Sequence, residues 1–238
     1  MLLNPRQTDS QPALSDRVFE WLAEQIVTGA LRPGQWVSEN EVAAQLGVSR
    51  SPVHEAFVRF ASEGLVEVRR RRGTIMADLD PEVADDLYRA RLLIEPEMAR
   101  MAVEHATEDE VKQAAAIAEE MRGALGDPRA IYMALLHLYQ LMLDTCPSAT
   151  IRDIVAMLWR RSLRFRGIVF RIPSLEPQKE VVAFAEQFVE LLQERDGEGA
   201  SVAMAKLLEN TQRSVHEYLV VTIGEQGLAT DGAQRLRA

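Results

Sequence analysis

The stretch that decides the fold is residues 38–76, SENEVAAQLGVSRSPVHEAFVRFASEGLVEVRRRRGTIM, in which two short helix patterns precede a hairpin pattern. Ser38 and Glu41 have the S-x-x-E spacing in which the two side chains cap the first turn of a helix reciprocally. Gly47 follows about two turns later and can adopt the left-handed conformation that ends helices. We therefore predict a short helix that begins at Ser38, of the length expected for a helix that positions a second one.

A second helix is predicted to begin at Ser49 or Ser51, with Pro52 tolerated in its first turn because the missing N–H would have no partner there. Its apolar residues recur at i, i+3, i+4 and i+7, which predicts that one face is buried. That face consists of Val53, Ala56, Phe57 and Phe60. The opposite face stays free near the helix start and carries Ser49, Arg50, Ser51 and His54.

Beyond Gly64 the sequence predicts a β-hairpin with a strongly basic turn. Its strands are Leu65, Val66 and Val68 paired with Thr74, Ile75 and Met76, and its turn holds Arg70, Arg71, Arg72 and Gly73. A basic turn suits the minor groove of DNA or the phosphates beside it, although most charge runs are simply solvated loops. An amphipathic helix upstream, ending at Gly29, completes a three-helix core. The order and spacing of these elements indicate a winged helix-turn-helix.

Residues 14–77 resemble the DNA-binding domain of the gluconate-repressor (GntR) family of bacterial transcription regulators. The resemblance rests on IVTGALRPGQWVSENEVAAQLGVSRSPVHEAFVRFASEGLV and on a wing that ends in RRG. It implies that double-stranded operator DNA is the partner and that Arg50 is the main base-reading residue. The expected DNA-binding residues are Ser38, Asn40, Ser49, Arg50, Ser51, His54, Arg70, Arg71, Arg72 and Gly73. Related proteins resemble one another in having arginines at the positions of Asn40 and His54, so a different operator is expected here.

Composition and charge agree with a DNA-binding unit joined to a second domain. The 238 residues are long enough for two domains, and their net charge is −9, of which residues 1–78 contribute only −1. The acidity therefore belongs mostly to the remaining residues, and the basic groups concentrate where DNA would bind. Cys146 is the only cysteine, which excludes an internal disulfide and a multi-cysteine metal site. No apolar run is long enough to cross a membrane and the start lacks a signal-peptide pattern, so we expect a cytoplasmic protein.

After Asp80 the strand patterns disappear and helix patterns follow to about residue 222. The overall fold is therefore expected to be mostly α, with a winged helix-turn-helix over residues 11–78 and an antiparallel bundle of six or seven helices over residues 80–223. Asp78 to Asp80 is the expected hinge. The predicted helices of the second domain are 80–105, 107–124, 127–144, 149–171, 177–195 and 198–222.

The segment YRARLLIEPEMARMA, residues 88–102, resembles the first helix of the all-helical effector domain (FCD-type) of the fatty-acid-responsive (FadR) branch of the family. Members of that branch are homodimers whose helical domain binds a small carboxylate or acyl ligand, often through a metal held by an Asp, a His four residues later and two further His. The corresponding positions here are Met133, His137, Ala185 and Leu207. We therefore expect no metal and no other cofactor, unless His216 shifts the register.

The residues expected to contact an effector are Arg91, His137, Arg160 and Arg164. Arg161 and Arg166 of the same predicted helix as Arg160 are further candidate anion partners, because guanidinium groups bind carboxylates in a bidentate manner. Other interpretations remain open for each. His137 lies between two leucines and could be a hydrogen-bonded core residue. Arg91 could simply pair with Glu95 along its helix, and the other arginines could be solvated or at an interface.

Enzymatic motifs are absent from the sequence, which contains neither a nucleophile elbow nor a phosphate-binding glycine loop. The sequence therefore favours a dimeric, ligand-responsive transcription regulator that acts as a repressor and does not cross a membrane. The alternative is an architectural DNA-binding module whose helical domain only dimerises and no longer binds an effector. A more distant alternative is an enzyme that acts on a small acid.

Overall fold

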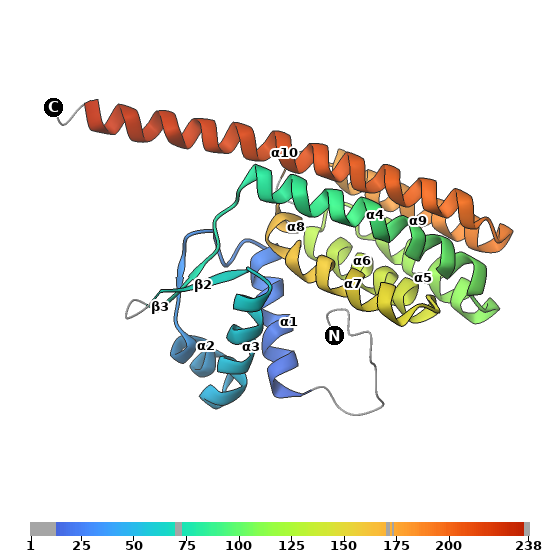
Figure 1. Cartoon of the computed structure of the whole chain (residues 1–238), viewed down its shortest axis with the longest axis horizontal. Helices are drawn as coiled ribbons and strands as arrows, with labels where there is room; N and C mark the ends of the chain where they lie inside the picture. The colour runs from blue at the N-terminus through green and yellow to red at the C-terminus, as the bar shows by residue number, and fades with distance from the viewer. Residues whose placement is uncertain (1–12, 70–72, 170–171, 173, 236–238) are drawn as a thin grey trace.

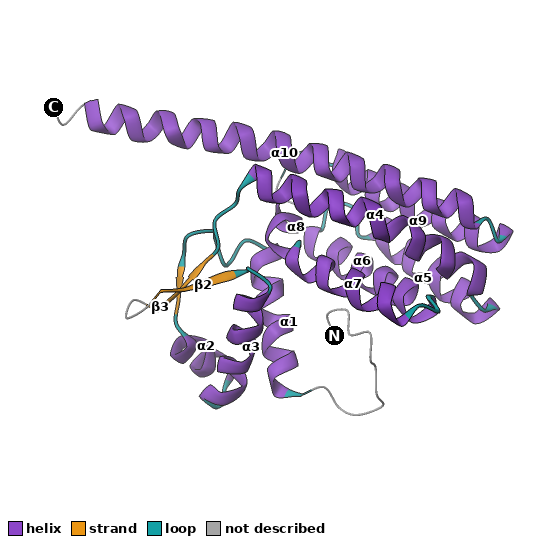
Figure 2. Ribbon diagram, in the orientation of Figure 1, coloured by secondary structure: helices purple, strands orange, loops and turns teal. Residues whose placement is uncertain are grey.

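The structure is a computed structural model that describes residues 13–69, 73–169, 172 and 174–235. It is mostly helical, with a small sheet near the N-terminus, as the sequence predicts (Figures 1 and 2). The N-terminal unit contains α1 (Leu14–Val27), β1 (Trp36–Val37), α2 (Glu39–Leu46), α3 (Arg50–Ser62), β2 (Val66–Arg69) and β3 (Gly73–Met76). The helical unit contains α4 (Pro81–His105), α5 (Glu108–Gly123), α6 (Pro128–Thr145), α7 (Ala149–Arg161), α8 (Leu163–Val169), α9 (Glu176–Glu194) and α10 (Gly197–Arg235).

The N-terminal unit is a winged helix-turn-helix whose sheet has the order β1-β3-β2. The predicted pairing of the two hairpin strands is confirmed, since Val66 pairs with Met76 and Val68 pairs with Thr74 in antiparallel strands, whereas Leu65 precedes β2. β1 was not predicted from the sequence, and it adds Trp36 opposite Ile75 on the other edge of β3. The sheet therefore fixes the chain that enters α2 as well as the wing.

Local capping sets both ends of α2, whereas α3 is positioned by its buried face. The Ser38 hydroxyl accepts a hydrogen bond from the Glu41 N–H at 3.5 Å, and Gly47 ends α2 with a φ of 65°. Ser49 occupies the cap position of α3, but its side chain makes no capping hydrogen bond. The buried face of α3 is the predicted one, and it packs on α1 through an edge contact between Phe60 and Phe19 at 4.6 Å between ring centroids. The opposite face of α3 is thereby left free.

The helical unit departs from the predicted helices at two places. The helix expected over 149–171 is interrupted at Ser162, which separates α7 from α8. The Ser162 hydroxyl donates to the Trp159 carbonyl at 2.7 Å and accepts from Arg166 Nε at 2.9 Å, so it provides local partners at the break. The helix expected to end near residue 222 instead continues as α10 to Arg235.

The helices α4 and α10 lie side by side over much of their lengths, and α10 projects beyond the bundle (Figure 1). α8 contacts α1, which joins the helical unit to the winged helix-turn-helix (Figure 1). An aromatic cluster of Tyr132, Trp159 and Tyr139 occupies the core between α6 and α7. In the described part of the chain, no helix combines the length and apolar character that a membrane span requires.

Candidate functional site

An open groove of about 540 Å³ lies between α2, the start of α3 and the base of the wing. It brings together four of the expected DNA-binding residues, Ser38, Asn40, Arg50 and Gly73. Ser49, Ser51 and His54 are exposed at the N-terminal end of α3, next to this groove. The expected contacts of Arg70, Arg71 and Arg72 lie outside the described residues. The expected DNA-binding residues that the structure describes therefore form one surface around the N-terminal ends of α2 and α3.

Glu39 organises the two longest side chains of this surface. The Glu39 carboxylate lies 3.2 Å from His54 Nδ1 and 4.0 Å from Arg50 Nη2, while the Arg50 and His54 side chains remain 70% and 65% exposed. A carboxylate in this position restrains both side chains without burying their polar atoms. Glu39 was not among the predicted site residues, although its place one residue before Asn40 puts it on the same helical turn.

Trp36 forms the other wall of the groove and was also not identified from the sequence. It is 47% exposed, and the Arg69 guanidinium lies 6.0 Å from its ring centroid. Gly73 lies next to it with a φ of 97°, and a Cβ at Gly73 would meet the Trp36 ring at 3.8 Å. The left-handed backbone at Gly73, rather than a lack of space, therefore favours glycine where the wing returns into β3.

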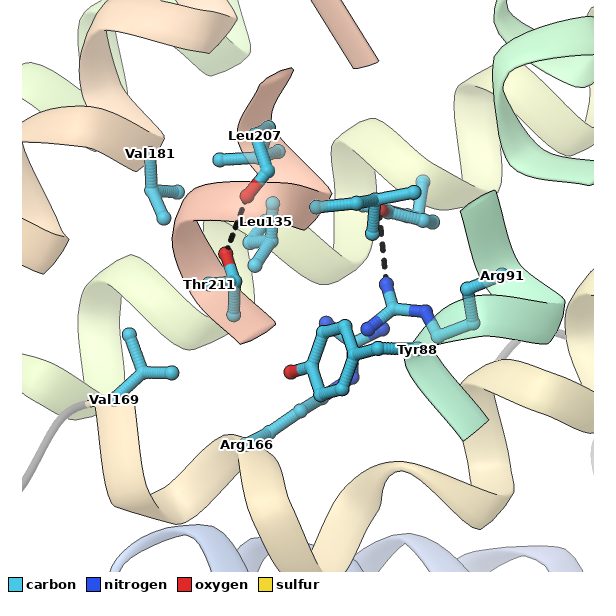
Figure 3. A pocket seen from close by; sticks show the side chains of 10 residues that line it. Tyr88, Arg91, Leu135, Arg166, Val169, Val181, Leu207 and Thr211 are labelled. Atoms are coloured by element: carbon cyan, nitrogen blue, oxygen red, sulfur yellow. Dashed lines mark hydrogen bonds between the residues drawn. The ribbon is translucent and has the colours of Figure 1, made fainter. Parts of the chain in front are cut away.

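A second site is a small internal pocket of about 30 Å³ in the helical unit (Figure 3). It is lined by Tyr88, Arg91, Leu135, Tyr139, Arg166, Val169, Val181, Leu207, Leu208 and Thr211 from α4, α6, α8, α9 and α10. In Figure 3, Val169 and Val181 lie on one side of the cavity, and Arg91 lies on the other. The pocket is therefore apolar on one side and carries positive charge on the other.

Arg91 already has an acidic partner in this pocket. Its Nε and Nη2 donate to the two oxygens of Glu95 at 2.6 and 3.0 Å, and both residues are buried. The Tyr139 hydroxyl donates to the same carboxylate at 2.9 Å. Burial raises the pKa of Tyr139, which keeps this hydroxyl protonated as a donor. Arg91 therefore lines the pocket as the effector prediction required, and it also makes the ion pair with Glu95 that the alternative interpretation named.

Arg166 is the second guanidinium of the pocket and is only 6% exposed. Its Nε donates to Ser162 Oγ, and its guanidinium lies 3.9 Å from the Trp159 ring centroid. Its Nη2 is buried without a hydrogen-bond partner, and it forms no ion pair with any described residue. Burial, followed by repulsion from Arg91, lowers the pKa of Arg166 to about 10, so the group remains charged near neutral pH.

The structure does not bring the other expected effector residues to this pocket. His137 lies on the exposed side of α6. Leu135 and Tyr139, one turn apart on the same helix, are the α6 residues that line the pocket. Arg160 and Arg164 face the winged helix-turn-helix instead. Arg160 Nε donates to Glu63 at 2.9 Å, and Arg164 Nη1 donates to the Asp78 carbonyl at 3.3 Å. These arginines thus contact the neighbouring unit, which agrees with the interface alternative.

The donor set of the pocket does not fit a divalent metal. Met133, Ala185 and Leu207 stand at three positions where the resemblance places metal ligands. Of these, only Leu207 is among the residues that line the pocket. The nearby carboxylate, Glu95, is already shared by Arg91 and Tyr139. Across residues 13–69, 73–169, 172 and 174–235, no group of three histidine, cysteine or acidic side chains is arranged to hold a metal. The guanidinium of Arg166, which lacks an acidic partner among the described residues, instead suits an anion.

Comparison with known proteins agrees with both units. Residues 14–76 match the family model "Bacterial regulatory proteins, gntR family", and residues 86–210 match the model of the FCD domain. The HTH-type transcriptional repressor RspR of Escherichia coli K12 is 27% identical over 217 residues, which cover 90% of this chain and 92% of RspR. The gluconate operon transcriptional repressor of Bacillus subtilis is 34% identical over 162 residues, which cover 66% of this chain and 64% of that protein.

Among solved structures, E. coli McbR/YncC aligns with a TM-score of 0.78 at 20% sequence identity, covering 87% of this chain and 99% of that chain. A GntR regulator from Rhodococcus sp. RHA1 aligns with a TM-score of 0.65 at 22% identity, covering 84% of this chain and 96% of that chain. At these identities the alignments establish a shared fold. The FCD model alone spans more than half of the chain. With its winged helix-turn-helix followed by an FCD domain, this chain belongs to the GntR family of DNA-binding bacterial transcription regulators.

Proposed function

We propose that this regulator is a homodimeric repressor that binds a near-palindromic operator and that a small carboxylate or acyl metabolite changes its affinity for DNA. The observation that carries the DNA-binding part is the exposed start of α3, where Glu39 holds Arg50 and His54. An arginine at the first turn of a recognition helix can donate to O6 and N7 of guanine in the major groove. Asn40 and Ser38 at the start of α2 supply further polar groups on the same groove.

Dimerisation follows from how such units read DNA. One recognition helix covers a single half-site, and two half-sites about one helical turn apart require two copies related by a two-fold axis. Exposed apolar side chains on α4 and α10 offer area for contact with a second copy. They are Leu93, Val202, Val220 and Val221.

Repression is supported by two relatives, RspR and the gluconate operon regulator, both of which are named repressors. A response to a small molecule is supported by the FCD domain and by the pocket within it. The buried Arg166 without an acidic partner among the described residues favours a ligand over the architectural alternative. A domain that served only to dimerise would gain nothing from a buried uncompensated charge.

The experiment that tests DNA recognition is selection of binding sites from random duplex DNA, followed by anisotropy titrations of the selected operator and of a scrambled duplex. A palindromic consensus bound by two chains supports the proposal, and a reporter gene under that operator distinguishes repression from activation. Arg89→Ala is a suitable control variant because Arg89 is an exposed residue of α4 outside the groove. Binding without any sequence preference would contradict the proposal.

A further inference from the structure

The pocket of the FCD domain contains one more buried positive charge than negative charge. Arg91 and Glu95 neutralise each other through a bidentate ion pair. Arg166 adds a second guanidinium, and among the described residues no carboxylate lies within ion-pair distance of it. A buried charge is costly unless it is paired, so this arrangement lacks one anion.

Two buried polar atoms of the pocket residues also lack partners. Arg166 Nη2 and the Tyr88 hydroxyl are both buried without a hydrogen bond, and both residues line the cavity. The remaining contacts of Arg166, Ser162 Oγ and the ring faces of Trp159 and Tyr139, hold its guanidinium in place but do not neutralise it. Buried donors in native proteins normally have partners, and the two here belong to one cavity.

We propose that this pocket binds a small monocarboxylate directly through protein side chains, with Arg166 Nη2 and the Tyr88 hydroxyl donating to the carboxylate oxygens and without a bridging metal. The proposal deepens the proposed function, on which it rests, by naming the ligand class and the residues that bind it. One negative charge balances the pocket, whereas a dianion would leave an excess of negative charge beside Glu95. A neutral acyl compound would leave Arg166 unpaired.

The size of the cavity limits the rest of the ligand. At about 30 Å³ the cavity has room for only a few non-hydrogen atoms. That space suits a carboxylate with a short alkyl tail. Val169, Val181 and Leu207 form the apolar wall that such a tail would contact. Acetate, propionate and butyrate are therefore suitable probes, and longer chains would have to displace this wall.

The test is a thermal-unfolding titration of the full-length protein with sodium propionate, acetate and butyrate, at constant ionic strength and in the presence of EDTA. Propionamide is the neutral isostere, succinate is the dianion, and inorganic phosphate tests for a general anion site. At about 100 times its dissociation constant, the bound monocarboxylate should raise Tm by at least about 4 °C. Propionamide, succinate and phosphate should raise it much less.

Arg166→Met and Tyr88→Phe test the two donors, and His137→Gln is the matched control because His137 is exposed on α6 outside the cavity. Arg166→Met should abolish the Tm shift caused by the monocarboxylate. It should not lower the Tm of the ligand-free protein, since it removes an unpaired buried charge. Arg166→Lys tests whether the guanidinium is needed, because it keeps the charge but loses the planar donor group. It should weaken binding at least about tenfold, and His137→Gln should leave binding unchanged.

The proposal is overturned if no monocarboxylate shifts Tm, if propionamide acts as strongly as propionate, if EDTA removes the shift, or if Arg166→Met keeps it. Failure of the proposed function would look different. If the protein binds its operator but does not bind propionate, the DNA-binding function stands and the monocarboxylate site is contradicted. If the protein binds propionate through Arg166 but its operator affinity is the same with and without propionate, the monocarboxylate site stands and the effector response of the proposed function is contradicted.

Discussion

Arg50 and Arg166 show how the surroundings of a residue decide what it can bind. Arg50 is exposed and shares Glu39 with His54, so its guanidinium is restrained but open to solvent. Arg166 is buried and packed against aromatic rings. The exposed Arg50 suits contact with DNA, which approaches from outside, and the buried Arg166 suits a small anion that enters the protein.

Arg50→Ala should cost about 1–3 kcal/mol of binding free energy on the selected operator and should flatten the preference at one base pair in each half-site. The reason is that a bidentate contact with guanine is lost, while phosphate contacts remain. Anisotropy titrations on the operator and on single-base variants measure both effects. Equal weakening on operator and random DNA would instead assign Arg50 to a phosphate.

Asn40→Arg combined with His54→Arg should move the selected consensus toward half-sites richer in guanine. Asn40 is exposed on the groove and His54 offers at most two hydrogen bonds, whereas arginine favours O6 and N7 of guanine. Parallel selections from random DNA with wild type and the double variant provide the comparison. An identical consensus for both proteins would show that these positions do not read bases.

At the residue scale, the sequence predicted contacts along one helix better than contacts between helices. The Arg91–Glu95 pair follows from their i, i+4 spacing and is present. Of the candidate arginines on the helix expected over 149–171, the one that enters the pocket is Arg166 rather than Arg160 or Arg164. The expected helix over 149–171 was continuous, but the break at Ser162 resets the helical phase, so sequence periodicity alone could not assign the inward face.

At the element scale, α2 depends on the left-handed residue that ends it. Gly47 has a φ of 65°, and a Cβ there would meet no atom within 4 Å, so only backbone strain opposes substitution. Gly47→Ala should lower the free energy of unfolding by about 1–2 kcal/mol. Gly123→Ala is the control, because Gly123 is helical in α5 with equal space, and it should be neutral or slightly stabilising. Urea unfolding measures both, and equal losses would contradict the explanation from φ.

The elements that the sequence predicted well are those with local signals. The capping box Thr107–Glu110 marks the start of α5, and Asp80 and Asp127 cap α4 and α6. By contrast, β1 has only two residues, and its partner strand β3 lies far along the chain. No local pattern could identify such a pairing, because it exists only once the wing has folded.

At the scale of the whole molecule, the pocket and the recognition helix are joined through a short series of contacts. Arg166 holds Ser162, which ends α7, and the last turn of α7 carries Arg160 and Arg161. Their Nε atoms donate to the two oxygens of Glu63 at 2.9 and 3.3 Å. Glu63 is the C-terminal cap residue of α3, so a change at Arg166 has a physical route to the proposed recognition helix.

Glu63→Gln should therefore reduce the change in operator affinity that propionate causes. The Glu63 side chain is only 12% exposed, and the substitution removes the charge shared by two arginines while preserving shape. A loss of about 0.5–2 kcal/mol in coupling free energy is expected. Anisotropy titrations with and without propionate measure this loss, and a double-mutant cycle with Arg160→Gln isolates the contribution of the Glu63–Arg160 pair.

Glu186→Gln is the matched control, because it removes an ion pair with Arg122 inside the helical domain. If both variants retain the full propionate response, the contacts at Glu63 hold the domains together without transmitting the ligand signal.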